Sequence, residues 1–125
     1  MQAPELLSQA RALLGLASPA TRGLWARAAA RLARQALEGA LDDYWQARRL
    51  PIGREVSRRA QFICLREYAR AHEKELAARL HHAWTALSQA CHHHGYELAP
   101  TAGELQGWME VVGDWLARQA GPSSP

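Results

Sequence analysis

The chain has 125 residues, 48% of them hydrophobic, and a formal net charge of +3. A chain of this length fits one domain with one hydrophobic core, so we predict a single helical bundle domain over residues 1–120. The two cysteines, Cys64 and Cys91, lack paired spacing, which excludes a disulfide framework and a zinc ribbon. No apolar run is long enough to span a membrane and the first residues lack a signal-peptide pattern, so we expect a cytoplasmic protein without membrane contact.

Helical periodicity runs through the whole chain, and no segment shows the sustained alternation of a half-buried strand. Apolar residues recur at helical spacing over residues 4–15, which predicts the first helix. Ser18 followed by Pro19 is typical of a helix start, so a second helix is predicted over residues 19–48, ended by Pro51. The predicted fold class is all-α, a compact up-and-down bundle of five helices.

The stretch from Arg54 to His94 contains no glycine or proline. Residues 56–69 are apolar on much of the helix circumference, which predicts a third helix at the centre of the bundle. A cleaner apolar stripe over residues 76–91 predicts a fourth, reaching to His94. One unbroken helix would be about 60 Å long, too long for a domain of this size, so we expect a break within residues 70–75.

Thr101 and Glu104 have the spacing of a capping box, which predicts that the fifth helix begins there. The residues after it, 121–125, are predicted to be a disordered tail. The chain has five tryptophans, and we predict that three of them lie in the core: Trp25, Trp84 and Trp108.

Arginines are concentrated in residues 11–70, which have a basic excess, whereas acidic residues predominate in residues 71–125. Such an asymmetry can attract a polyanion or orient an acidic partner, although solvated arginines on helix faces would give the same pattern. The residues predicted to bind a nucleic acid or a partner are Arg27, Arg31, Arg34, Arg54, Arg58 and Arg59.

Residues 90–98 read ACHHHGYEL and hold the most reactive side chains of the sequence. Only Cys91 and His94 have the spacing with which a helix presents two metal ligands, so no metal site is predicted and no cofactor is expected. Cys91 continues the apolar stripe and is predicted to pack in the core. His92, His93 and His94 remain as candidate catalytic residues, or as charges that stabilise the end of a helix.

The segment from Leu87 to Tyr96, followed by a capped last helix, resembles the end of a HEPN domain. Members of that family are small helical bundles, often dimeric, of bacterial toxin–antitoxin and phage-defence systems. Many cleave RNA and others are inactive. Their signature is an arginine, often followed by a polar residue, with a histidine a few positions on.

In this sequence His93 or His94 matches the family histidine and Gln89 matches the polar residue, but Ser88 stands where the arginine is expected. A literal match to the signature occurs elsewhere, from Arg66 to His72. The resemblance and the departure at Ser88 together favour a HEPN-like interaction module that is non-catalytic or altered. It is expected to act as a homodimer or with another protein, and to associate with RNA.

Two alternatives remain open. One is a metal-independent endoribonuclease in which a histidine from residues 92–94 works with an arginine from elsewhere, such as Arg66, Arg79 or one across a dimer. The other is a structural adaptor whose arginine face meets an acidic protein. No pattern in the sequence indicates a small-molecule substrate.

Overall fold

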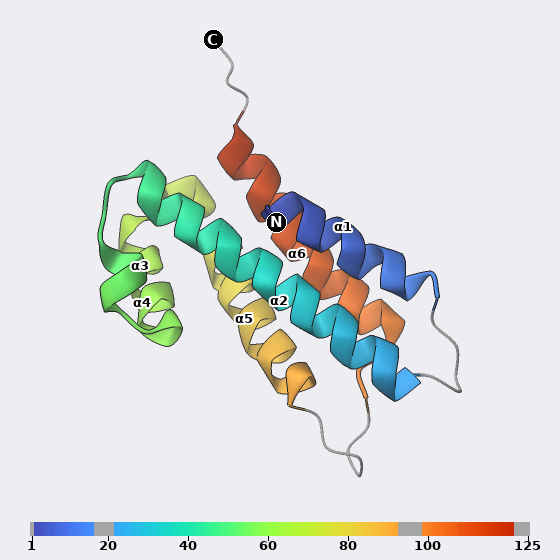
Figure 1. Ribbon diagram of the computed structural model, residues 1–125. Helices are drawn as coiled ribbons and strands as arrows, with labels where there is room; N and C mark the ends of the chain where they lie inside the picture. The colour runs from blue at the N-terminus through green and yellow to red at the C-terminus, as the bar shows by residue number, and fades with distance from the viewer. Residues whose placement is uncertain (1, 17–21, 93–98, 122–125) are drawn as a thin grey trace.

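All the regular structure of the described residues is helical in the computed structural model, which describes residues 2–16, 22–92 and 99–121 (Figure 1). This confirms the predicted all-α bundle of five main helices. The main helices are α1 (Ala3–Leu14), α2 (Arg22–Ala47), α4 (Arg58–Tyr68), α5 (Lys74–Cys91) and α6 (Ala102–Ala120). Two short elements, α3 (Ile52–Glu55) and the 3-10 turn η2 (Ala71–Glu73), precede α4 and α5.

Helices α1, α2, α5 and α6 form the body of the bundle, and each runs antiparallel to the one before it in this order (Figure 1). Helix α1 packs on α2 and α6, and α5 packs on the same two helices from the other side. Helices α3 and α4 lie beside the end of the bundle where α2 ends and α5 begins (Figure 1). Helix α2 is therefore the central element, because it contacts α1, α3, α5 and α6.

The prediction that residues 56–69 form the central helix was wrong. Helix α4 begins only at Arg58, after Ser57, whose side chain accepts a hydrogen bond from the Ala60 amide. It packs mainly on α5, and Ile63 on its outer side is 64% exposed. The central position belongs to α2 because its small side chains let helices approach closely on several sides. Its buried alanines are Ala26, Ala29, Ala30, Ala33, Ala36 and Ala40.

The end of α2 is set by a local backbone turn before the proline is reached. Arg49 has a positive φ of 56°, and the amide of Leu50 donates to the carbonyl of Trp45. This pattern resembles a Schellman motif, in which a left-handed residue stops the helix and satisfies a free carbonyl group. Pro51 then starts the next turn, so the predicted end at residue 48 is close to the observed one.

The predicted break between the third and fourth helices is confirmed, although no glycine or proline marks it. Ala69 and Arg70 are extended, with ψ values of 142° and 154°, and η2 follows. The side-chain amine of Lys74 donates to the backbone carbonyl of Arg66, which satisfies a free carbonyl at the end of α4. A charged side chain from the start of α5 therefore stabilises the end of α4.

Helix α5 ends at Cys91, earlier than predicted, and the amide of His92 donates back to Gln89. Other expectations fall on residues outside the described segments. These are the helix start at residues 18–19, the two histidines His93 and His94, and the tail at residues 122–125. No described helix is long and apolar enough to cross a membrane.

The tryptophans that lie in the core are not the same three that were predicted to lie there. Trp25 is buried as expected, whereas Trp84 and Trp108 are only half-buried. The two that are fully enclosed are Trp45 of α2 and Trp115 of α6. Both lie against Tyr44, so an aromatic cluster forms the core near the end where α2 ends and α6 ends.

The capping box at the start of α6 is confirmed: Thr101 Oγ1 accepts from the Glu104 amide at 3.0 Å, and Glu104 accepts from the Thr101 amide at 2.9 Å. Replacing Thr101 with alanine is expected to lower the free energy of unfolding by about 1 kcal/mol, because a helix N–H loses its acceptor. Urea denaturation measures the change. The control is Thr85→Ala, since Thr85 donates only to a helix carbonyl at His81, and that variant should be neutral.

Candidate polyanion-binding site

Three of the predicted binding arginines lie along one side of α2. Arg27, Arg31 and Arg34 are spaced four and three residues apart, which puts them on one face of a helix. All three guanidinium groups act electrostatically on the thiol of Cys91, the last residue of α5. The three arginines therefore lie within electrostatic range of the end of α5, where His92 is exposed. We call these four residues (Arg27, Arg31, Arg34 and His92) the α2–α5 basic face.

Cys91 itself lies behind this face and is only 8% exposed, which confirms its predicted place in the core. Burial raises the pKa of the Cys91 thiol, and it outweighs the positive charges of Arg34 and Arg31, which act to lower it. A thiol with a raised pKa is a poor nucleophile at neutral pH. The chemistry available at this end of α5 is therefore that of the arginines and the histidine.

Glu38 is the acidic residue of α2 that lies nearest to this row of arginines along the helix. Its Oε2 atom accepts from the indole nitrogen of Trp84 at 3.0 Å and lies 3.6 Å from Arg34 Nε. It also lies 4.0 Å from Arg58 Nε. One carboxylate is thus shared among three donors, so it compensates only part of the positive charge on the face.

Arg58 was predicted to bind a partner, but the structure uses it to hold α4 against α2. Its guanidinium donates to both carboxylate oxygens of Asp42, at 2.6 and 3.1 Å, and to Gln61 at 3.2 Å. Hydrogen bonding to Asp42 raises the pKa of Arg58. Gln61 in turn accepts from Trp45 and donates to the Val56 carbonyl. Arg58 is therefore the centre of a part-buried polar link between the two helices.

Arg59 belongs to a separate surface, on α4. Its charge and that of Arg66 act on His81 of α5, whose ring stacks on Phe62 with centroids 4.7 Å apart and planes 5° from parallel. Burial lowers the pKa of His81, and Arg66, Arg59 and His82 lower it further. The side chain of Arg54, the sixth predicted arginine, lies outside the described part of the chain.

The lowered pKa of His81 predicts a loss of stability in acid. The folded protein holds this proton less tightly than the unfolded chain, whose histidine has the ordinary pKa of 6.5. The stabilising contribution is therefore present above about pH 6.5 and is lost as the pH falls below that value. Urea midpoints measured at neutral and acidic pH should fall less in His81→Gln than in the unchanged protein. His72→Gln, at an exposed position that is not among the groups acting on His81, is the control and should keep the full pH dependence.

The residues of the HEPN-like signature are only partly described. Ser88, which stands in the arginine position, is half-buried, and its Oγ is enclosed without a hydrogen-bond partner among the described residues. The two residues of the literal signature match, Arg66 and His72, have different neighbours. Arg66 acts electrostatically on His81, whereas the backbone carbonyl of His72 accepts from Arg118 at 3.4 Å. Within the described segments, no three His, Cys, Asp or Glu side chains come together as metal ligands.

The polar partners behind the arginine row were not predicted. The pairing of Arg34 with Glu38 has a local signal, the spacing of four residues on a helix. The hydrogen bond from Trp84 to Glu38 joins residues 46 positions apart, and no local sequence signal indicates it.

In comparisons with protein-family models, with curated proteins and with solved structures, nothing matches this chain.

Proposed function

We propose that this chain is a HEPN-like helical module that binds RNA through the α2–α5 basic face, as a homodimer or together with another protein, without strong catalysis of its own. The observation that carries the proposal is the row of Arg27, Arg31 and Arg34 on one face of α2, a helix that packs on α5, with all three within electrostatic range of the last residue of α5. A guanidinium group is suited to phosphate because it donates two parallel hydrogen bonds and keeps its charge.

The dimensions of the row suit a nucleic-acid strand. Arg27 and Arg34 are separated by about 10 Å along the helix axis, and one strand of a duplex carries a phosphate about every 3.4 Å of axis. The row can therefore meet two or three phosphates from a rigid support. His92 is exposed at the end of α5 beside this row, and its ring can donate a hydrogen bond to a phosphate oxygen.

The serine at position 88 supports the part of the proposal that the chain lacks strong catalysis of its own. In the resemblance this position belongs to the arginine that meets the phosphate, and a serine supplies no positive charge to a phosphate-bearing transition state. The Oγ of Ser88 is also enclosed in the described structure, so it is not exposed to a bound RNA. With the basic face present and the arginine absent at position 88, we expect RNA to be bound but not cleaved.

Fluorescence anisotropy of a labelled single-stranded RNA, titrated at several salt concentrations, tests the proposal. With about three phosphates neutralised, log K should fall with log salt with a slope of about −2, and the RNA should stay intact. A peptide nucleic acid of the same sequence, which lacks phosphates, is the control and should not bind. If RNA does not bind while an acidic peptide does, the face serves an acidic protein partner and the RNA proposal fails.

A second candidate function is a metal-independent endoribonuclease. It is favoured by the position of His92, exposed beside arginines of α2 that could replace the one missing at Ser88. Incubation with total RNA in the presence of a chelator should then give fragments that disappear when His92, His93 and His94 are all changed to alanine. Equal background cleavage by both proteins would exclude this function.

A further inference from the structure

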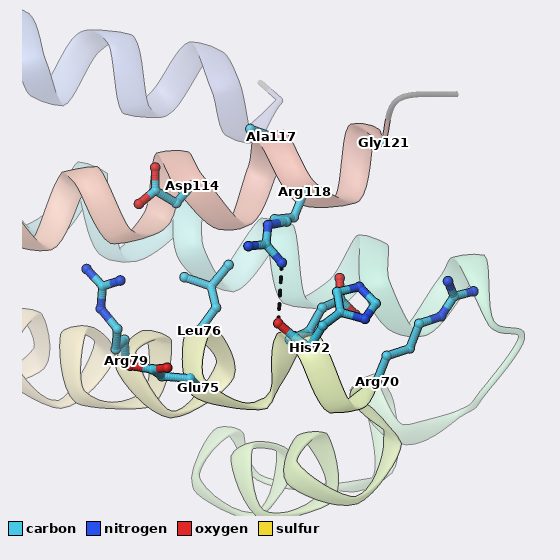
Figure 2. Close-up of a pocket in the computed structure, with 10 residues that line it drawn as sticks. Arg70, His72, Glu75, Leu76, Arg79, Asp114, Ala117, Arg118 and Gly121 are labelled. Atoms are coloured by element: carbon cyan, nitrogen blue, oxygen red, sulfur yellow. Dashed lines mark hydrogen bonds between the residues drawn. The ribbon is translucent and has the colours of Figure 1, made fainter. Parts of the chain in front are cut away.

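A large cavity lies at the other end of α5, away from the basic face, between the start of α5 and the end of α6 (Figure 2). It measures about 890 Å³, within the range of about 300–1,000 Å³ typical of small-molecule sites. Segment 70–79 forms one wall and residues 114–121 of α6 and its end form the other. The two walls are far apart in sequence, so no local motif indicates the cavity.

Charged side chains of both signs line this cavity, and no two of them are paired with each other. Among the described residues, the ion pairs within 4.0 Å all involve Arg34 or Arg58, which lie elsewhere. Arg118 of α6 reaches across to the backbone carbonyl of His72, whereas Arg79 and Asp114 stand on opposite walls (Figure 2). The charged residues lining the cavity are Arg70, Arg79, Arg118, Glu73, Glu75 and Asp114.

Glu73 is the unusual member of the set because it is buried, with only 6% of its surface exposed. Oε2 accepts from Gln119 at 3.2 Å, but Oε1 is enclosed and has no partner among the described residues. Although Glu73 immediately precedes α5, its side chain does not cap the helix. A buried carboxylate oxygen without a donor is unfavourable, so helix capping does not account for this arrangement.

A second polar group, Tyr44, lies within electrostatic range of Glu73. Its hydroxyl is enclosed, and its charged neighbour is Arg48, whose guanidinium carbon lies 3.5 Å from the centroid of the Tyr44 ring. Burial is the main cause that raises the pKa of Tyr44; the charge of Arg48 acts to lower it, and the negative charge of Glu73 acts to raise it. Tyr44 therefore gives Glu73 no compensating positive charge, and Oε1 of Glu73 keeps its capacity to accept from a hydrogen-bond donor. An ammonium group has three such donors and a compensating charge.

We propose that this cavity binds a small zwitterion, with its ammonium group on Glu73 and its carboxylate or phosphate group on Arg118 and Arg79. The guanidinium groups supply the charge-assisted contacts that an oxyanion requires, and Glu73 supplies the matching contact for the cation. Gln119 holds the other Glu73 oxygen, Oε2, at 3.2 Å, so Oε1 is the atom that the ammonium group would satisfy.

Calorimetric titration of the full chain with linear amino acids tests the proposal. A series with one to five methylene groups between the ammonium and carboxylate groups varies the spacing of the two charges. One member should bind at least about tenfold more tightly than the alkylamine and the alkylcarboxylate of the same length, since each of these has only one of the two charged groups. Equal binding of the carboxylate alone would show a simple anion site and overturn the proposal. No binding by any member would overturn it as well.

Two variants show whether the bound molecule occupies this cavity. Glu73→Gln and Arg118→Gln should each weaken the preferred amino acid about tenfold, with folding checked by circular dichroism. Arg118 is exposed, so its replacement leaves the core intact even if Glu73→Gln does not fold. Glu67→Gln, at an exposed position on α4 outside the cavity, is the matched control. Unchanged binding in Arg118→Gln would place the ligand elsewhere and overturn the proposal.

Discussion

Replacing Arg27, Arg31 and Arg34 together with glutamine is expected to weaken RNA binding about 100-fold, on the order of 1 kcal/mol for each phosphate that is no longer bound. The effect should be greatest at low salt, because the interactions are electrostatic and release counterions. The slope of log K against log salt should approach zero in the triple variant. Anisotropy titrations with the same labelled RNA at several salt concentrations measure both quantities.

The matched control for the triple variant is Arg49→Gln, which removes an exposed arginine at the opposite end of α2. It should lower affinity by less than about twofold, since a distant exposed charge is largely screened. Stability should also be compared, because Arg34 lies 3.6 Å from Glu38 and its replacement leaves that carboxylate to Arg58 and Trp84. If the control and the triple variant weaken binding equally, affinity reflects net charge and the α2–α5 basic face is not the site.

The fold was predictable from sequence wherever the signal was local. The capping box at Thr101 is four residues long and depends only on the side chains and amides of Thr101 and Glu104. The break near Ala69 followed from length, because one helix through residues 54–94 would exceed the size of the domain. The buried place of Cys91 followed from the period of the apolar stripe.

The place of each helix in the bundle was less predictable. The apolar residues Phe62 and Ile63 of α4 gave it the composition of a central helix, yet Ile63 faces outward. Helix α2 holds the centre with alanines, whose small size matters more than their hydrophobicity. Periodicity shows which residues share a face, but it does not say how many neighbours a helix will have.

The candidate sites were the least predictable, because they join distant parts of the chain. Arg58 was predicted to be a binding residue, because no local pattern shows that it will pair with Asp42, which lies sixteen positions earlier on another helix. Glu73 and Gln119 are joined across 46 positions, and the two walls of the cavity come from equally distant parts of the chain. A charged residue can therefore be assigned to a binding surface only after its partners in the fold are known.

Removing the Trp45 side chain is expected to destabilise the protein by about 3–5 kcal/mol, a large fraction of the total of about 5–15 kcal/mol for a domain. Trp45 is only 1% exposed, and its ring meets Tyr44 and Tyr68 edge-on with centroids 5.0 and 5.9 Å away. Its indole nitrogen also donates to Gln61 at 3.3 Å, the residue that anchors Arg58. Trp45→Ala therefore opens a cavity and weakens the link between α2 and α4.

Urea denaturation followed by far-ultraviolet circular dichroism measures this destabilisation, with Trp108→Ala as the control. Trp108 is half-buried, so its removal should lower the free energy of unfolding by clearly less. Trp45→Phe helps to separate the two causes, because it keeps most of the packing while it removes the hydrogen bond to Gln61. We expect that variant to be less stable by about 1–2 kcal/mol. Equal effects of Trp45→Ala and Trp108→Ala would contradict the central role of Trp45, since the cost of truncation rises with the volume left empty in the core.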